Sequence, residues 1–169
     1  MDLFEAIKTR RSIRSFTEEP VSQEDMDRML EAAMCAPSAN NRQLWHFVVI
    51  RDREMLRKVA EVHPYAKMAA GAAAAVIICA DLNEEKTLGF WVQDCSAATQ
   101  NFMLAARALN IGTVWCGLHP IEDRARPFRE IFHMPDNIRP LSLIVLGHTD
   151  QEFKAQERFR AERVHNEDW

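Results

Sequence analysis

The sequence predicts an α+β fold in which helices cover a mixed sheet, built as one domain over residues 1–169. The chain has 169 residues and is 47% hydrophobic, which is enough for one buried core without disulfides or structural metals. Amphipathic helical segments alternate along it with short, β-branched apolar runs. Because no repeat, low-complexity linker or shift in composition divides the chain, we expect a single unit.

The first fifty residues predict two helices and one strand. Apolar residues within positions 3–7 form one or two turns of an amphipathic helix, and the chain then becomes extended over 10–16. Ser22 is the expected N-cap of a second helix, which ends near Pro37. The run WHFVVI at 45–50 is β-branched and aromatic, so it predicts a strand.

The middle of the chain predicts a helix, a buried strand and the longest helix. Asp52 is positioned to open the helix that follows the first strand. The run AAAAVIICA at 72–80 allows a helical start in its alanines, whereas its β-branched end predicts a strand buried on both faces. From Leu88, apolar positions recur at helical spacing for about six turns and stop at Asn110 and Gly112.

The last third predicts a strand at 113–116, a short helix at 124–132, and a buried strand at 141–146 that ends at Gly147. Residues 150–169 are too polar for a core element, yet they carry regularly scattered apolar side chains. We therefore expect this tail to wrap over another surface.

Charge and motif spacing argue against several classes of function. The 21 Lys and Arg residues against 25 Asp and Glu residues give a net charge of −4, the reverse of what nucleic-acid binding favours. The glycines lack the spacing of dinucleotide-binding or P-loop motifs, and the histidines are too scattered for a metal site. The cysteines are too far apart for redox or zinc motifs, so we expect buried, reduced thiols. These cysteines are Cys35, Cys79, Cys95 and Cys116.

The sequence also predicts a soluble, cytoplasmic protein without a membrane partner. Positions 1–11 carry charges of both signs, unlike a targeting segment. The longest apolar run, at 72–80, is too short to span a bilayer.

Two basic clusters suggest an anion site. The first consists of Arg10, Arg11, Ser12 and Arg14. It suits phosphate, because guanidinium groups bind phosphate oxygens in pairs, although a solvated basic turn explains it equally well. The second lies in the tail and consists of Lys154, Arg158, Arg160 and Arg163. Such a cluster is usually a solvated tail, yet two separate basic clusters in an acidic chain hint at one shared phosphate.

Two further segments are candidates for contact with a flat ligand. APSANNRQLW at 36–45 is a polar loop whose amide side chains suit the edge of a heterocycle such as a pyrimidine, and turn formation explains them equally well. Trp115, Cys116 and Gly117 follow a short strand, and the glycine lets a backbone N–H approach a ligand closely. An ordinary strand end has this composition more often.

Five motifs in order resemble the nitroreductase family. They are RRSIR at 10–14, APSANNRQLW at 36–45, WVQDCSAATQN from 91, WCG at 115–117, and LGH followed by RFRAERVHNEDW near the end. The resemblance spans nearly the whole chain. It implies a homodimer with a mostly antiparallel sheet and a tail that wraps the dimer partner. It also implies FMN, bound non-covalently at the subunit interface by residues of both chains.

The resemblance assigns roles toward FMN to particular residues. The phosphate would be held by Arg10, Ser12 and Arg158, with Arg11 and Arg160 as helpers, and Arg14 would lie near the N1 and C2 carbonyl edge of the ring. The partner subunit would line the ring with Pro37, Ser38, Ala39 and Asn41, and Gln43 would support that loop. A backbone N–H near flavin N5 would come from Trp115, Cys116 and Gly117. Candidates for the pyrimidine and substrate side are Tyr65 and Lys67.

The activity implied by the resemblance is electron transfer from NADH or NADPH, through flavin N5, to an electron-poor acceptor such as a nitroaromatic or quinone, in a ping-pong sequence. Since the flavin carries the chemistry, no side-chain nucleophile, general base or metal is required. Three alternatives stay open. The protein could reduce a specific metabolite, such as an enone or a halogenated aromatic, or bind FMN without turnover. It could also be a phosphate or nucleic-acid adaptor.

Overall fold

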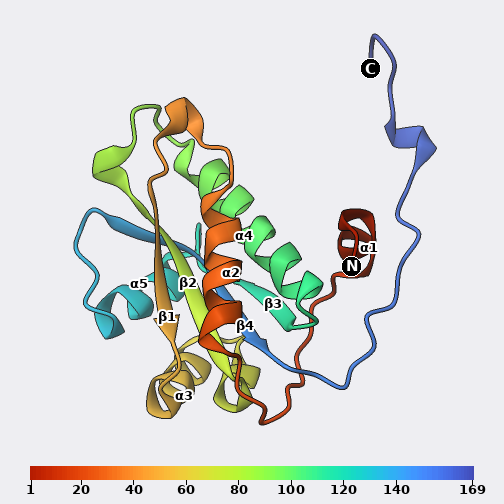
Figure 1. The fold of residues 1–169 in the computed structure, drawn as a ribbon. Coiled ribbons are helices and arrows are strands. Elements are labelled where there is room, and N and C mark those ends of the chain that lie inside the picture. Colours follow the sequence, from red (N-terminus) through yellow and green to blue (C-terminus); the bar gives the residue numbers. More distant parts are fainter.

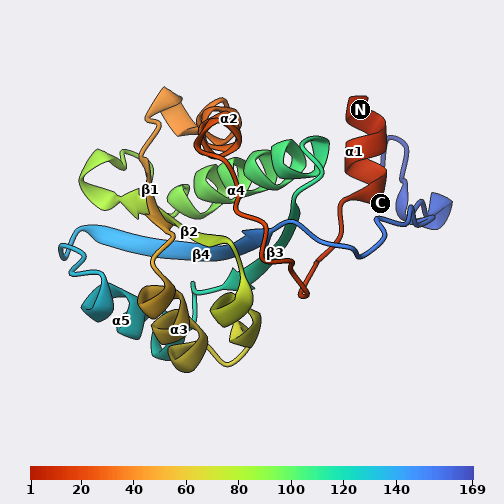
Figure 2. The same cartoon turned by 60° about the horizontal axis from the view of Figure 1, so that its bottom comes forward.

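The computed structural model describes residues 1–169 and places one four-stranded sheet between two layers of helices (Figure 1). Helices α2 and α4 cover one face of the sheet, whereas α3 and α5 cover the other (Figure 2). Helix α1 lies at one end, beside the C-terminal tail. The helices are α1 (Leu3–Thr9), α2 (Gln23–Met34), α3 (Arg53–Val62), α4 (Trp91–Ala108) and α5 (Glu122–Ile131). The strands are β1 (Trp45–Ile50), β2 (Ala74–Asp81), β3 (Gly112–Gly117) and β4 (Ile138–Gly147).

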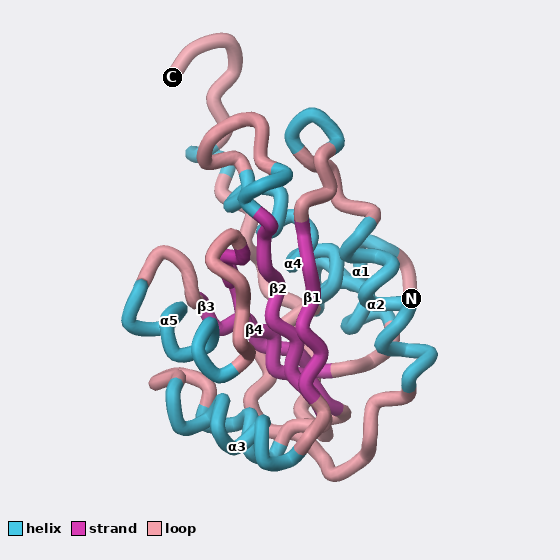
Figure 3. Tube along the Cα trace, turned by 90° about the vertical axis from the view of Figure 1, so that its left-hand side faces the viewer, coloured by secondary structure: helices cyan, strands magenta, loops and turns pink.

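The strands follow the order β1-β2-β4-β3 (Figure 3), and each neighbouring pair is antiparallel. The central pair, β2 and β4, aligns Val76 with Ile144. The parallel pairing is an isolated bridge between Ser12 and Thr113, on the edge strand β3. The predicted α+β fold with a mostly antiparallel sheet is therefore confirmed, and its parallel component is the N-terminal segment.

Strand β2 is buried on both faces because its alternate side chains enter two different cores. Val76 and Ile78 pack in the core beneath α2 and α4. Ala75 and Ile77 pack in the core beneath α3 and α5. Since strand side chains alternate between faces, a nearly continuous apolar run is what a strand covered on both sides requires.

The two predicted N-caps are confirmed. The hydroxyl of Ser22 accepts a hydrogen bond from the backbone N–H of Asp25 at 3.0 Å. The carboxylate of Asp52 accepts one from the backbone N–H of Met55 at 2.9 Å. Each bond satisfies a backbone donor that the first helical turn leaves free. The starts of α2 and α3 are therefore set by the capping side chains directly before them.

Two element starts in the middle of the chain differ from the expectations. Helix α4 begins at Trp91 rather than Leu88 and spans 18 residues, about five turns rather than six. Gly89 has a φ of +87°, which a right-handed helix cannot include. The suggested helical start of 72–80 is also wrong, because β2 begins at Ala74 and the preceding turn is a short 3-10 helix at Lys67–Gly71.

Two later elements begin earlier than expected. Helix α5 starts at Glu122 rather than position 124. Strand β4 starts at Ile138 rather than position 141, because it pairs with β2 as far as Asp81. No helix in the structure combines the length and apolar character that crossing a bilayer requires.

The four cysteines are free thiols, and their burial differs from the expectation in one case. Cys79, Cys95 and Cys116 are buried as predicted, but Cys35 is exposed. Cys35 is the C-cap of α2, where the chain has already turned away from the core that holds Ala33.

The tail after β4 runs away from the helical layers and passes α1 (Figure 1). It contains one short 3-10 turn, Ala161–Arg163. Phe153 is partly buried, whereas Phe159, Val164 and Trp169 are exposed, Trp169 almost completely at 99%. The wrapping of the tail over another surface stays a prediction.

Candidate functional site

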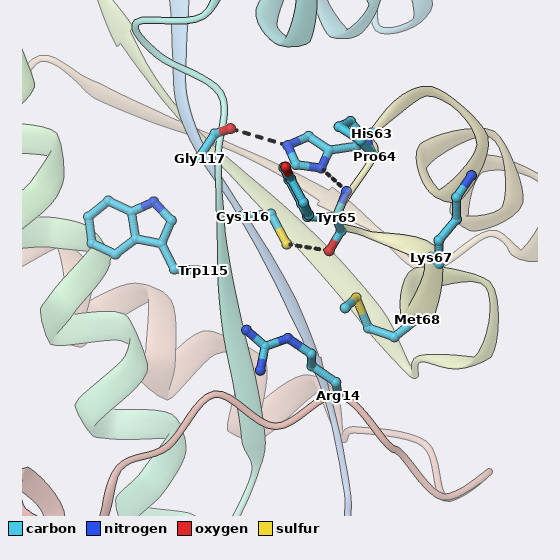
Figure 4. Close-up of a pocket in the computed structure, with 9 residues that line it drawn as sticks. All are labelled: Arg14, His63, Pro64, Tyr65, Lys67, Met68, Trp115, Cys116 and Gly117. Carbon is cyan, nitrogen blue, oxygen red and sulfur yellow. Dashed lines mark hydrogen bonds between the residues drawn. The ribbon is translucent and has the colours of Figure 1, made fainter.

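A pocket of about 470 Å³ opens beside β3 (Figure 4). Three chain segments meet there: the extended stretch after α1, the turn after α3, and the end of β3. The lining residues are Arg14, His63, Pro64, Tyr65, Lys67, Met68, Trp115, Cys116 and Gly117. The structure thus brings four predicted ring-binding residues together with both candidates from the turn after α3. We call this cavity the ring pocket.

The position of Arg14 follows from how the N-terminal segment docks on β3. The backbone N–H of Ile13 donates to the carbonyl of Thr113 at 2.9 Å, and the Ile13 side chain is buried. Since extended chain alternates its side chains, Ser12 and Arg14 face outward, and both are exposed. The docking requires Gly112, because a Cβ there would lie 2.8 Å from Cγ2 of Ile13.

Trp115 and Cys116 lie on opposite sides of β3 (Figure 4). Trp115 is partly exposed, whereas Cys116 is buried and its thiol donates to the carbonyl of Tyr65 at 3.5 Å. Burial raises the pKa of Cys116 to about 11, and the nearby guanidinium of Arg14 offsets this only in part. The thiol is therefore neutral near pH 7 and does not act as a nucleophile.

His63 is a buried member of the ring pocket whose place the sequence did not reveal. Its Nδ1 accepts from the backbone N–H of Tyr65 at 3.2 Å, so the proton sits on Nε2, which donates to the carbonyl of Gly117 at 3.1 Å. Burial lowers the pKa of His63. The neutral imidazole therefore ties the turn after α3 to the end of β3. Its one sequence signal was a histidine directly before Pro64, which is too common to identify a site.

Near α1, a second pocket of about 350 Å³ gathers cations from both ends of the chain. We call it the cation pocket. Arg10, Arg11 and Arg158 line it, together with Gln100 of α4 and Glu157 of the tail. None of the three arginines forms an ion pair. Arg10 and Arg11 of the first basic cluster and Arg158 of the second therefore meet at one pocket, whereas the other members of the two clusters do not line it.

The electrostatics of the cation pocket favour a bound anion. Burial lowers the pKa of Arg10, and the neighbouring charges of Arg158 and Arg11 lower it further. The Nε of Arg11 is buried without a hydrogen-bond acceptor. An anion would relieve the repulsion and supply that acceptor. Ser12 and Arg160, also predicted for the phosphate, do not line this pocket.

The predicted ring-lining loop lies elsewhere in the same chain. Pro37, Ser38 and Ala39 line a third pocket, of about 360 Å³, together with Asp94 and its neighbours on α4. We call it the loop pocket. Within one chain, the structure does not bring these residues into the ring pocket or the cation pocket.

Side-chain hydrogen bonds hold the loop in a strained form. Asn41 and Gln43 both have a φ near +50°, which costs energy in residues with a side chain. The hydroxyl of Ser38 accepts from the backbone N–H of Gln43 at 2.9 Å, and the Gln43 amide donates to Oδ1 of Asn41 at 3.0 Å. Oδ1 of Asp94 accepts from the backbone N–H of Ala39 at 3.0 Å. The loop is thus preorganised.

Comparisons with known proteins agree on one family. The family description "Nitroreductase family" matches residues 7–77 and 63–148. A relative from Methanothermobacter thermautotrophicus, provisionally named NADH dehydrogenase/NAD(P)H nitroreductase, is 48% identical over 100% of this chain and 88% of its own. "FMN reductase [NAD(P)H]" of Bacillus subtilis is 28% identical over 99% of this chain and 74% of its own.

A solved structure extends the agreement to three dimensions. It is a provisionally named nitroreductase of Desulfovibrio desulfuricans in complex with FMN. The two chains are 32% identical and superpose with a TM-score of 0.86, covering 99% of this chain and 97% of the other.

Proposed function

Because the chain belongs to the nitroreductase family and is an NAD(P)H-dependent FMN oxidoreductase, we propose that it passes electrons from NAD(P)H to an electron-poor acceptor. The acceptor class is a nitroaromatic or a quinone, and donor and acceptor use the site in turn, in a ping-pong sequence. When bound, FMN supplies the redox centre that accepts hydride and returns electrons. The chain's own residues bind, orient and balance charge.

The observation that carries the proposal is the convergence of Arg10, Arg11 and Arg158 in the cation pocket. A phosphate monoester would supply the negative charge that none of these guanidinium groups has as a partner. The orphaned Nε of Arg11 fits the same ligand. This pocket would therefore hold the FMN phosphate, with Ser12 and Arg160 as outer contributors.

The ring pocket would take the isoalloxazine. Arg14 brings a permanent cation to it, and a cation there stabilises negative charge on the bound ring. Trp115 offers an aromatic surface, and the backbone around Cys116 and Gly117 can approach a flat ligand closely. The side chains of His63 and Cys116 are bonded to backbone groups of the pocket wall, so their role would be to shape the pocket around the ring.

A second copy of the chain would complete the site. The loop residues Pro37, Ser38, Ala39, Asn41 and Gln43 stay apart from the ring pocket within one chain, and a homodimer would bring them from the partner. A face for that partner exists, because Leu3, Phe4 and Ile7 of α1 are exposed. Beside them lies an apolar groove of about 450 Å³ between α1, α2 and α4. Light scattering coupled to size-exclusion chromatography should give twice the chain mass of 19.5 kDa.

The decisive experiment is a visible absorption spectrum, followed by anaerobic addition of NADH or NADPH. We expect flavin bands that bleach with one of the two donors and return when a nitroaromatic or quinone is added. A protein that binds FMN but is reduced only very slowly would be a binding protein without turnover. A colourless protein that fails to bind added FMN would overturn the proposal.

A further inference from the structure

Arg107 is a buried cation that joins three separate parts of the chain. It lies in the last turn of α4 and is only 7% exposed. Its Nε donates to Oγ1 of Thr9 at 2.8 Å, and its Nη1 donates to Oδ1 of Asn110 at 3.2 Å. Its guanidinium carbon lies 4.1 Å from the ring centroid of Phe153 in the tail. Because a buried charge is costly unless its donors are bound, these contacts hold the guanidinium in one orientation.

The contacts of Arg107 fall on the segments that carry the cation pocket. Thr9 directly precedes Arg10, and Phe153 lies five residues before Arg158 in the same tail. Gln100, which lines the cation pocket, lies seven residues before Arg107 on α4 and therefore on the same face, two turns away. Arg107 itself does not line the pocket. It connects the end of α1 and the tail, which carry the arginines of the pocket, to α4, which contributes Gln100 to the same pocket.

The tail has little else to hold it there. Gln151 accepts a hydrogen bond from the backbone N–H of Arg14 at 3.4 Å and is the last tail residue bonded to the domain. Beyond it, hydrogen bonds and ion pairs stay within the tail, as between Arg158 and Gln156. The Phe153 ring on Arg107 thus helps to direct the remaining tail toward the cation pocket. This contact has to oppose the repulsion between Arg10 and Arg158.

We propose that Arg107 is a positioning residue for the FMN phosphate: it anchors the end of α1 and the tail on α4 and so keeps Arg10 and Arg158 at one pocket. The inference rests on the proposed function, because it assigns the cation pocket to phosphate. It adds a residue that acts through others rather than by contact with the ligand.

Riboflavin provides the test, because it has the ring of FMN without the phosphate. Flavin fluorescence quenching would measure the dissociation constants of both flavins for the full-length protein and for Arg107→Met. Methionine keeps an unbranched chain of similar length but removes the charge and the donors. We expect FMN to bind about tenfold more weakly, the usual effect of weakening charge-assisted hydrogen bonds, and riboflavin binding to stay unchanged. Arg107→Lys keeps the charge, so its dissociation constant for FMN should lie between those of the wild type and Arg107→Met.

A matched control is Arg51→Met. Arg51 is half-buried, less so than Arg107, and it donates to a backbone carbonyl, that of Val21, at 2.7 Å, but it lies outside the cation pocket. This variant should lose stability without changing the preference for FMN over riboflavin. Equal weakening of both flavins in Arg107→Met, or no weakening, would overturn the positioning role. A wild-type protein that binds both flavins equally would instead contradict the phosphate assignment itself.

Two milder variants keep the test valid if Arg107→Met fails to fold. Thr9→Val removes one acceptor with little change of shape, and Phe153→Leu removes the aromatic face. Each should weaken FMN binding several-fold while leaving riboflavin unaffected. Combined, they should weaken it by less than the product of the single effects, because both act through one guanidinium. If both single variants kept the wild-type preference for FMN over riboflavin, the positioning role of Arg107 would be refuted.

Discussion

The imidazole Nε2 of His63 lies 3.1 Å from the carbonyl oxygen of Gly117, although 54 residues separate them along the chain. This bond closes one side of the ring pocket, because it joins the turn after α3 to the end of β3. It also requires a neutral imidazole, since Nδ1 accepts from the backbone N–H of Tyr65. The stability of this wall therefore depends on pH.

His63→Gln should reduce the dependence of stability on pH. Burial lowers the pKa of His63 below its usual 6.5, so the unfolded chain binds a proton more readily than the folded one. The contribution of neutral His63 to the unfolding free energy is complete above pH 6.5. It is lost as the pH falls below 6.5 toward the folded-state pKa. Chemical denaturation from pH 5 to 8 should show a smaller fall in the unfolding free energy for the variant than for wild type. The exposed His165→Gln is the control, and parallel curves for His63→Gln and wild type would refute the role.

Arg14→Ala should lower the reduction potential of bound flavin without abolishing binding. The guanidinium lies in the ring pocket, where it stabilises the negative charge that reduction adds. We expect a midpoint about 30 mV more negative, which for two electrons corresponds to about 1.4 kcal/mol. Anaerobic dye-equilibration titration measures this, and Arg14→Lys should recover part of the shift. An unchanged potential in Arg14→Ala would remove the assigned role.

Gly112→Ala should weaken both folding and FMN binding. The added Cβ would lie 2.8 Å from Cγ2 of Ile13, so the N-terminal segment has to move away from β3 and take Arg14 with it. Overpacking of this kind costs about 1–3 kcal/mol. Gly71→Ala is the matched control, because a Cβ there meets nothing within 4 Å. Thermal melts and FMN titrations that do not distinguish the two variants would contradict the docking argument.

The Cys116 thiol should resist alkylation in the native protein. With its pKa raised to about 11 by burial, roughly one molecule in a thousand carries the thiolate at pH 8. Peptide mapping by mass spectrometry after iodoacetamide treatment should find Cys116 modified in urea but not in buffer. Rapid modification in buffer would show that the pocket opens, or that the thiolate is stabilised there.

The local features of the chain were predictable because neighbouring residues decide them. Strand β1 has the predicted limits, and Ser22 and Asp52 cap the helices they were expected to cap. Boundaries shifted where a single residue or a distant partner intervened, as with Gly89 before α4 and the pairing of β4 with Asp81. His63 was missed because its partner, Gly117, lies far along the chain.

The sequence by itself determined the family, the α+β class and the two basic clusters, because local propensity, apolar periodicity and motif order are all properties of the chain read in order. Only the tertiary structure decided that Arg10, Arg11 and Arg158 share one pocket, and that Pro37, Ser38 and Ala39 lie in another. The reason is physical. A buried charge or an orphaned donor is defined by groups that converge from distant positions, and folding alone brings those groups together.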